Sequence, residues 1–399
     1  MSILIHYQRA ITLLVDGTVR RLDTVPTPDM VPDIVETGAG FVEQIHMSVD
    51  GFTMYALTEC GHVTENYHDS KKCKDITHKV DNMLDCDAES KLVTTGYNSL
   101  VVAKGHTVVK VFTNGFFSRV CSRTFGSEID MVSSIYIKTG DNELYPLSND
   151  AHPKPIDFDH TEHISKIVGC QGITFIILKN GLVYAQGNYH CSRDNKPFGL
   201  VVLPPNERVV DISCGNVYVF YIMESGSCYH THMPIDPFSN GQRDSRGLRP
   251  DYVPFMSGCV VEKVYVLTSC IVFQHDESKL SLVHLERSNW KAVINDGFYT
   301  GKTKPIRLDF FDDKSVVSVM QYHDYIYFVT ESGQVYYCLY KPEQEWLRIT
   351  DYGFEPCNDG VFKMPIREIA FFRSNPIKVV SKACQVRSAG SLIPCKVQT

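Results

Sequence analysis

The sequence predicts an all-β fold that is built from one repeated hairpin. A short apolar strand, a polar turn and a second strand recur along the 399 residues at intervals of about 35–45 residues. Most of these turns contain glycine, which accepts the positive φ that tight hairpin turns need. The apolar runs are rich in Val, Ile, Tyr and Phe and show no sustained helical periodicity. Strand-only repeats of this length are typical of β-propeller blades rather than of helical solenoids.

Eight hairpins can be recognised in chain order. Seven have a glycine in the turn, namely Gly17, Gly61, Gly105, Gly140, Gly181, Gly226 and Gly333, and they span residues 11–19, 55–63, 100–112, 135–145, 174–184, 219–229 and 327–336. The eighth hairpin, residues 270–283, turns through Asp-Glu-Ser-Lys without glycine. One hairpin buries too little apolar surface to fold alone, so we expect neighbouring hairpins to stack and cover each other's sheets.

The two ends of the chain are expected to meet. The first hairpin has little sequence before it, and a last apolar run lies at residues 377–384. If these segments share the closing blade, no sheet edge is left exposed to pair with another chain. We therefore expect residues 1–399 to form a single propeller.

Two segments resemble the repeat of the regulator of chromosome condensation family. That repeat runs through apolar residues to a Cys-Gly or similar pair, then a strand, a glycine turn, an aromatic residue and often Gly-Asn. The matching residues are Cys214, Gly215, Gly226 and Tyr229 in one copy, and Gly181, Tyr184, Gly187 and Asn188 in the other; Phe198, Gly199, Leu200 and Pro204 match the family's trailing segment. The resemblance implies antiparallel four-stranded blades, seven in number, whereas the hairpins allow eight.

The resemblance covers residues 164–229 well, residues 316–339 fairly and the rest weakly. Tyr218 stands where the family often has histidine, and Gln321 and Tyr322 stand where it has Cys-Gly. The family implies guanine-nucleotide exchange on a small GTPase, which depends on a protruding wedge and acidic loop residues. No segment matches those features. We therefore expect a non-enzymatic protein-interaction scaffold, as part of a cytoskeletal or regulatory assembly, with exchange on a small GTPase as the alternative.

Composition narrows the range of partners. With a net charge of −7, the chain lacks the excess of basic residues expected of a nucleic-acid binder, so protein partners are expected. The two tryptophans, Trp290 and Trp346, are followed by Lys291 and Leu347, which disfavours a propeller built on Trp-Asp repeats.

Fourteen cysteines contain no Cys-x-x-Cys pair, so the pattern does not predict a zinc site. Several fall on expected strands, among them Cys170, Cys214, Cys228 and Cys270, where a reduced thiol acts as a small hydrophobe.

The sequence has no stretch of 18 apolar residues, and its first residues do not form a signal peptide. These features favour a cytoplasmic protein, with nuclear or cytoskeleton-associated residence left open.

Motifs for catalysis and cofactor binding are not found. Residues 297–303 resemble the end of a phosphate-binding loop but have three residues between the glycines where four are needed. The pairs His160/His163 and His230/His232 each offer two metal ligands without a nameable third. We therefore expect no catalytic, cofactor-binding or metal-binding residues.

Two polar loops are the candidates for partner binding. Residues 233–254 are rich in proline and arginine and longer than a connection between blades requires, with Arg243, Asp244, Arg246 and Arg249 at their centre. The second loop, residues 190–197, contains Arg193 and Asp194. The alternative for the first loop is a solvated insertion without a binding role.

Overall fold

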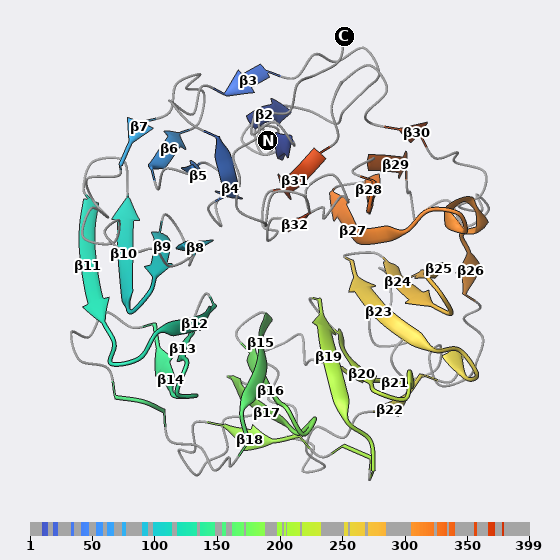
Figure 1. Ribbon diagram of the computed structural model, residues 1–399. Helices are drawn as coiled ribbons and strands as arrows, with labels where there is room; N and C mark the ends of the chain where they lie inside the picture. Colours follow the sequence, from blue (N-terminus) through green and yellow to red (C-terminus); the bar gives the residue numbers. More distant parts are fainter. Residues whose placement is uncertain are drawn as a thin grey trace, which may run out of the picture.

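The fold is described by a computed structural model of the chain. It describes residues 10–14, 19–22, 33–35, 41–47, 53–58, 62–67, 74–76, 90–94, 99–113, 118–133, 136–147, 154–156, 162–170, 173–187, 198–201, 203–204, 206–215, 218–232, 251–253, 256–267, 270–284, 305–322, 325–332, 335–339, 355–356, 366–371 and 377–378. These residues form short antiparallel sheets arranged around a common centre, which is the architecture of a β-propeller (Figure 1).

The described strands make eight sheets, each built around one of the expected hairpins. The first sheet contains β1 (Ala10–Leu14), β2 (Val19–Leu22), β3 (Asp33–Val35), β31 (Ile366–Phe371) and β32 (Ile377–Lys378). The next contains β4 (Val42–Met47), β5 (Thr53–Thr58), β6 (Val63–Tyr67) and β7 (Lys74–Asp75). The third contains β8 (Ser90–Thr94), β9 (Ser99–Lys104), β10 (Thr107–Thr113) and β11 (Ser118–Thr124), and the fourth contains β12 (Ile129–Val132), β13 (Tyr136–Thr139) and β14 (Leu144–Pro146).

The second half of the chain repeats the four-stranded plan. One sheet contains β15 (Ile164–Cys170), β16 (Ile173–Leu178), β17 (Val183–Gly187) and β18 (Gly199–Leu200), and the next contains β19 (Val209–Cys214), β20 (Tyr218–Met223), β21 (Cys228–His232) and β22 (Asp251–Tyr252). The last two contain β23 (Val261–Val266), β24 (Cys270–His275), β25 (Lys279–His284) and β26 (Ile306–Arg307), then β27 (Val316–Tyr322), β28 (Tyr325–Thr330), β29 (Val335–Leu339) and β30 (Glu355–Pro356). A short 3-10 helix, Asp309–Phe311, precedes β27.

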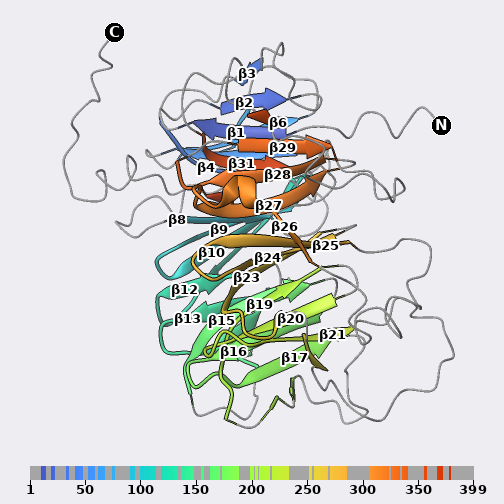
Figure 2. The same ribbon diagram turned by 90° about the vertical axis from the view of Figure 1, so that its right-hand side faces the viewer.

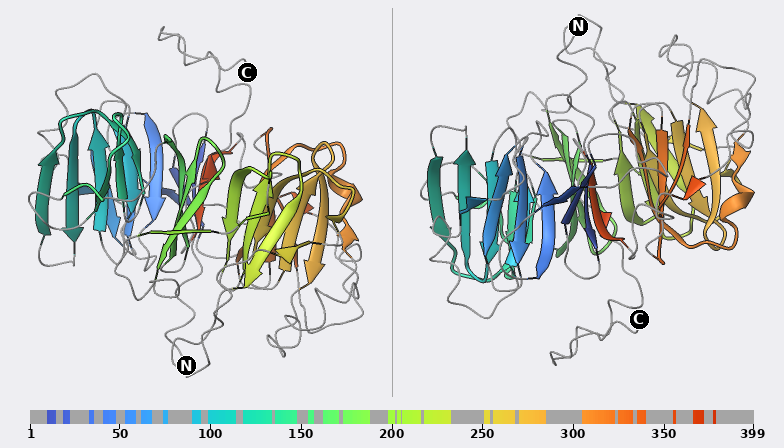
Figure 3. Two further views of the ribbon diagram at one scale, coloured as in Figure 1. Left: turned by 90° about the horizontal axis from the view of Figure 1, so that it is seen from below. Right: turned by 90° about the horizontal axis from the view of Figure 1, so that it is seen from above.

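The all-β propeller expected from the sequence is therefore confirmed, and the hairpin without a turn glycine is present as β24 and β25. The blade number of seven is not confirmed, because the described residues form eight sheets. Seen from the side of the ring, many of the strands run along the direction of the ring axis (Figure 3).

The first sheet combines both ends of the chain. Strand β1 pairs with β2 on one side and with β31 on the other, and β32 pairs with β31. Residues 377–384, which the sequence predicts to pair with the N-terminal strands, contribute only Ile377 and Lys378 to the described sheet, and Ile366–Phe371 lies directly beside β1. Figure 2 shows β31 among β1, β4 and β28.

One strand in each of seven sheets carries a β-bulge at the same place, and in all but the first sheet it is the inner strand. In β19, Val209 pairs with Met223 and Asp211 pairs with Ile222, so Val210 is an extra residue. The same register shift occurs in β4, β12, β15, β23, β27 and β31, and the residues that follow the extra one are Gln44, Met131, Lys166, Asp211, Lys263, Ser318 and Glu368. A bulge re-aims the side chains that follow it. The bulge thus explains the sequence pattern at the start of each of these strands, where two variable residues stand between two aliphatic residues.

Apolar cores lie between successive sheets. Tyr55 and Leu57 of one sheet pack with Val102 and Val109 of the next, and comparable clusters join each following pair of sheets up to β27–β30. Phe220 and Phe273 meet edge to face at 5.6 Å between two of these sheets. Both faces of the middle strands are covered, so β16, β20 and β24 are buried at every residue.

Candidate functional site

The candidate site is a pocket at the inner strands, where the bulges place polar side chains from neighbouring sheets together. It has a volume of about 330 Å³, within the range of small ligand sites. Its lining comes mainly from β15, β19, β23 and β27 and comprises Lys166, Asp211, Ile212, Ser213, Cys214, Ile222, Lys263, Val264, Tyr265, Val266, Leu267, Ser318 and Val319. Four of these residues follow a bulge directly: Lys166, Asp211, Lys263 and Ser318.

An ion pair joins two of the sheets at one side of the pocket. The Nζ atom of Lys166 donates a hydrogen bond to Oδ1 of Asp211 at 2.5 Å, and the backbone N–H of Ile212 donates to the same oxygen at 2.7 Å. The side chains of Lys166 and Asp211 are 46% and 28% exposed, so solvent screens this pair. The two charges compensate each other and fix the position of the carboxylate.

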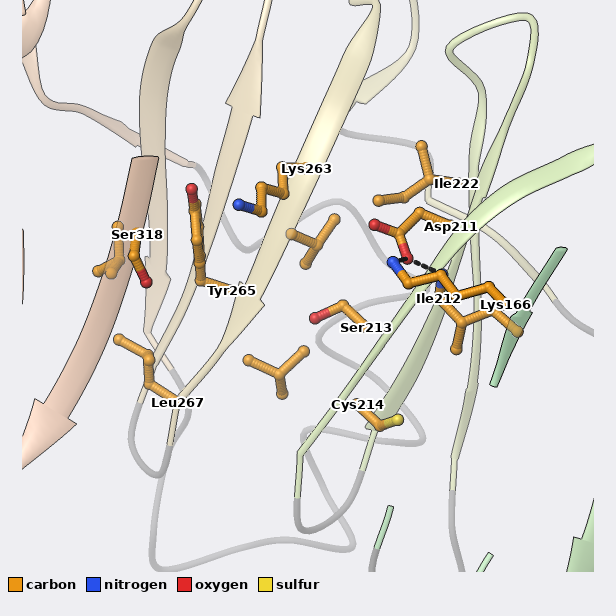
Figure 4. Close-up of a pocket in the computed structure, with 13 residues that line it drawn as sticks. Lys166, Asp211, Ile212, Ser213, Cys214, Ile222, Lys263, Tyr265, Leu267 and Ser318 are labelled. Atoms are coloured by element: carbon orange, nitrogen blue, oxygen red, sulfur yellow. Dashed lines mark hydrogen bonds and ion pairs between the residues drawn. The ribbon is translucent and has the colours of Figure 1, made fainter. Parts of the chain in front are cut away.

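Lys263 lies between this ion pair and the opposite wall. Figure 4 shows Lys166 and Asp211 on one side of Lys263, and Tyr265 and Ser318 on the other. Its Nζ atom donates to the backbone carbonyl oxygen of Val317 at 2.9 Å and lies 5.1 Å from the centre of the Tyr265 ring. Burial lowers the pKa of Lys263; Asp211 raises it and Lys166 lowers it further. The described lining of the pocket thus holds two lysines and one aspartate, which leaves one formal positive charge uncompensated by a carboxylate of that lining.

Tyr265 lines the pocket beside Lys263, and a hydrogen bond fixes its position. Its side chain is buried, and its hydroxyl donates a hydrogen bond to Oε1 of Gln274 at 3.0 Å. Burial, followed by the charge of Glu262, raises the pKa of the Tyr265 phenol above its usual value. The tyrosine therefore stays neutral and offers Lys263 the face of its ring.

Cys214 lines another side of the pocket, next to a close contact made by Gly215. Gly215 follows β19, and a Cβ atom at this position would lie 2.4 Å from Cγ1 of Val266 in the neighbouring sheet. Only glycine allows so close an approach, and this contact sets the distance between β19 and β23. Cys214 lines the pocket just before this contact.

Of the four histidines singled out in the sequence, His163 and His230 have side chains that the structure describes, and neither lines this pocket. His230 is buried on β21 and stacks against the rings of Tyr218 and Phe220, so it belongs to the core. His163 is exposed just before β15. His160 lies outside the described residues, and of His232 the structure describes the backbone alone, as the last residue of β21.

The expected partner-binding residues also lie outside the part of the chain that the structure describes. These residues are Arg193, Asp194, Arg243, Asp244, Arg246 and Arg249. The pocket residues were missed because Lys166, Asp211 and Lys263 come from three different repeats. In the sequence, each of the three follows an aliphatic residue and one variable residue. This shared position is the pattern that could have identified them.

Two further observations concern the thiols and the helical segments of the described residues. Six cysteines have side chains that the structure describes, and they form no disulfide among the described residues: Cys121, Cys214, Cys228, Cys259, Cys270 and Cys338. Cys228 and Cys270 are buried, and burial raises the pKa of each, as expected for thiols that act as small hydrophobes. None of the helical segments in the described residues is long and apolar enough to cross a membrane.

Comparisons with known proteins agree with the fold and go no further. No family model and no curated protein matches the sequence. Among solved structures, dihydro-heme d1 dehydrogenase NirN matches with a TM-score of 0.57 and 9% identity, over 94% of this chain and 76% of that one. Prp20p from Saccharomyces cerevisiae, the yeast RCC1, matches with a TM-score of 0.44 and 11% identity over 83% and 80% of the two chains. The β-propeller domain of Cps50 (Swd1) from Myceliophteria thermophila matches with a TM-score of 0.43 and 6% identity over 73% and 95%. At sequence identities this low, a structural likeness bears on the fold alone.

Proposed function

We propose that the protein is a non-enzymatic interaction scaffold that holds an acidic segment of a protein partner at its inner-strand pocket. The observation that carries this proposal is Lys263, which faces a backbone carbonyl and an aromatic ring, while the one carboxylate of the described lining is paired with Lys166. A carboxylate of a partner that enters the pocket would supply the missing negative charge.

The polar groups of the pocket favour binding over covalent catalysis. A serine or cysteine nucleophile needs a neighbouring base to activate it, most often histidine. The described lining includes Ser213, Cys214 and Ser318 but no histidine. The side chains of the pocket stand on paired strands, which hold them in fixed positions and suit recognition by shape and charge.

The arginine-rich loop, residues 233–254, is proposed as a second contact with the partner. Its residues Asp251 and Tyr252 form β22, and the part before them connects β21 with β22 in the same sheet as β19 of the pocket. Arg243, Arg246 and Arg249 can form bidentate hydrogen bonds with carboxylates. In the smaller loop, Arg193 can do the same, whereas Asp194 would bind a basic group of the partner. Acidic segments of one partner would supply carboxylates to both the loop and the pocket.

The proposed setting is a cytoplasmic regulatory or cytoskeletal assembly, because the described cysteines form no disulfide among themselves and the net charge is acidic. Membership of the regulator of chromosome condensation family is part of this proposal, and the Cys214-Gly215 and Gly226 motifs support it. Nucleotide exchange on a small GTPase is the alternative that this membership would support.

Affinity capture with point variants tests the proposal. Lys263→Met should reduce recovery of the partner, since it removes the uncompensated charge and keeps the apolar stem. The triple variant Arg243→Ala, Arg246→Ala, Arg249→Ala should reduce it as well. The matched control is Lys154→Met, because Lys154 is an exposed lysine outside the pocket.

Equal recovery with wild type, Lys263→Met and Lys154→Met would contradict a role for the pocket. Acceleration of nucleotide release from a panel of GDP-loaded small GTPases, at catalytic concentrations of the protein, would favour the alternative over a pure scaffold.

A further inference from the structure

A second cluster of polar side chains lies away from the pocket, at one end of the β23–β26 sheet. Cys259 lies in the turn before β23, His275 is the last residue of β24, and Asp276 begins the turn between β24 and β25. The thiol, imidazole and carboxylate ligand atoms of these three residues all lie within 4.8 Å of one another. Two ligands bound to one tetrahedral zinc ion are roughly 3.3–3.8 Å apart, so the three atoms need only a small movement to share an ion.

We propose that Cys259, His275 and Asp276 bind a divalent transition-metal ion of the zinc type. A thiolate, an imidazole nitrogen and a carboxylate oxygen form a mixed donor set that suits zinc, whereas magnesium and calcium prefer oxygen alone. A deprotonated Cys259 and an ionised Asp276 would together balance the two positive charges of the ion. Cys259 and Asp276 are both partly exposed, so an ion and one water ligand can reach the site from solvent.

The neighbours of His275 offer one ring nitrogen to a metal ion and a hydrogen-bond acceptor to the other. Its side chain is only 7% exposed, its Nδ1 lies 3.0 Å from Oδ2 of Asp276, and its Nε2 lies 2.8 Å from Oγ of Ser281. Metal-bound histidines usually donate the N–H of their other ring nitrogen to a neighbouring acceptor, which fixes the tautomer. In the metal-free protein, Nδ1 donates to Oδ2 of Asp276. With an ion bound, Nε2 would carry the proton and donate to Oγ of Ser281, and the lone pair of Nδ1 would face the ion.

The backbone holds the other two ligands in place. The N–H of Val260 donates to Oδ1 of Asp276 at 2.8 Å, and the N–H of Asp276 donates to the carbonyl oxygen of Val260 at 3.0 Å. This pair of hydrogen bonds ties the residue after Cys259 to Asp276. Oδ2 of Asp276 is the oxygen that faces His275, so Oδ1 can keep its backbone partner while Oδ2 binds the ion.

Cobalt(II) is the probe for this site, because a thiolate ligand gives the ion a charge-transfer band in the near ultraviolet. The reduced, metal-free full-length chain should develop this band on titration with Co²⁺ and lose it when Zn²⁺ is added. Cys259→Ser and Asp276→Asn should each reduce the band strongly, while Cys121→Ser, which changes a partly exposed thiol on β11, should leave it unchanged. Ser281→Ala should weaken zinc binding by about 10–100-fold, as expected for a residue that orients a ligand.

Asp276→Asn keeps the test valid if Cys259→Ser fails to fold. Asparagine tolerates the positive φ of position 276 and can still accept the hydrogen bond from Val260. Circular dichroism should show the wild-type β-sheet spectrum for each variant. The absence of a band in the wild type, or a band of equal strength in the wild type and the Asp276→Asn variant, would overturn the metal site.

Discussion

The carbonyl oxygen of Gly226 accepts a hydrogen bond of 2.9 Å from the backbone N–H of Val261, which joins a hairpin turn to the inner strand of the next sheet. The turn glycines Gly105 and Gly181 accept in the same way from Ile129 at 2.7 Å and Val209 at 3.2 Å. The recurring glycine of the sequence therefore has two roles. It turns the hairpin, and it links each of these sheets to its successor just before the bulge.

Gly226→Ala should destabilise the fold through this link. Gly226 has a φ of +83°, and a Cβ atom would lie 2.7 Å from Cγ1 of Val260 and 2.9 Å from its Cα. The left-handed conformation costs a residue with a Cβ atom roughly 1–2 kcal/mol, and overpacking typically adds about 1–3 kcal/mol. We expect a loss of roughly 2–5 kcal/mol in the free energy of unfolding, measured by urea denaturation.

Gly258→Ala is the matched control for this prediction. Gly258 has a φ of +84°, but a Cβ atom added at this position would have no atom of the described residues within 4 Å. It should show the conformational penalty alone, roughly 1–2 kcal/mol. Equal losses for the two variants would mean that the contact with Val260 does not contribute.

Removal of residues 366–399 should open the ring. Strand β1 would lose its partner β31, and an unpaired strand edge promotes aggregation. We expect insolubility or a large fall in melting temperature. Removal of residues 379–399 is the control, because it leaves every described strand in place. A soluble, monomeric product of the first deletion with the wild-type melting temperature would show that β31 is not needed for closure.

The hairpins were predictable from the sequence because the alternation of strands and the glycine of a turn are local signals. All eight expected hairpins are present as paired strands. Strand β31 was missed for a physical reason. Its bulge gives Ile366, Arg367, Glu368 and Ile369 the spacing of a helix rather than the period of two that identifies a strand.

Neither cluster of polar residues could be predicted in the same way. Lys166, Asp211 and Lys263 meet only because successive sheets are placed side by side with their bulges in equivalent positions. Cys259 and His275 are separated by the whole of β23 and most of β24, so the spacing of cysteines in the sequence does not reveal their contact.

Acid should destabilise the protein in part through His284. Burial lowers the pKa of this histidine below 6.5, so the unfolded chain binds a proton more readily than the folded one. Stability therefore rises with pH between the folded pKa and 6.5, and it is lost as the pH falls through that window. His284→Gln should reduce the slope of melting temperature against pH there. The control is His163→Gln, which changes an exposed histidine. Identical slopes for wild type and His284→Gln would contradict the prediction.

Glu277→Gly should stabilise the hairpin that lacks a turn glycine. Asp276, Glu277 and Ser278 have φ values of 44°, 65° and 74°, so three consecutive residues with Cβ atoms adopt the left-handed region. The turn is supported by Oε1 of Glu262, which accepts from the backbone N–H groups of Glu277 at 2.8 Å and Ser278 at 3.3 Å. Glycine at position 277 would keep those bonds and remove a conformational cost of roughly 1–2 kcal/mol, at an entropic cost of about 0.5–1 kcal/mol.

The net gain expected for Glu277→Gly is about 0.5–1 kcal/mol in urea denaturation. The side chain of Glu277 is exposed, so its removal takes little packing from the core. Glu262→Ala is the opposing variant, because it removes the carboxylate that supports the turn and should lower the stability. A loss of stability with Glu277→Gly would mean that the glutamate side chain contributes more to the turn than its left-handed backbone costs.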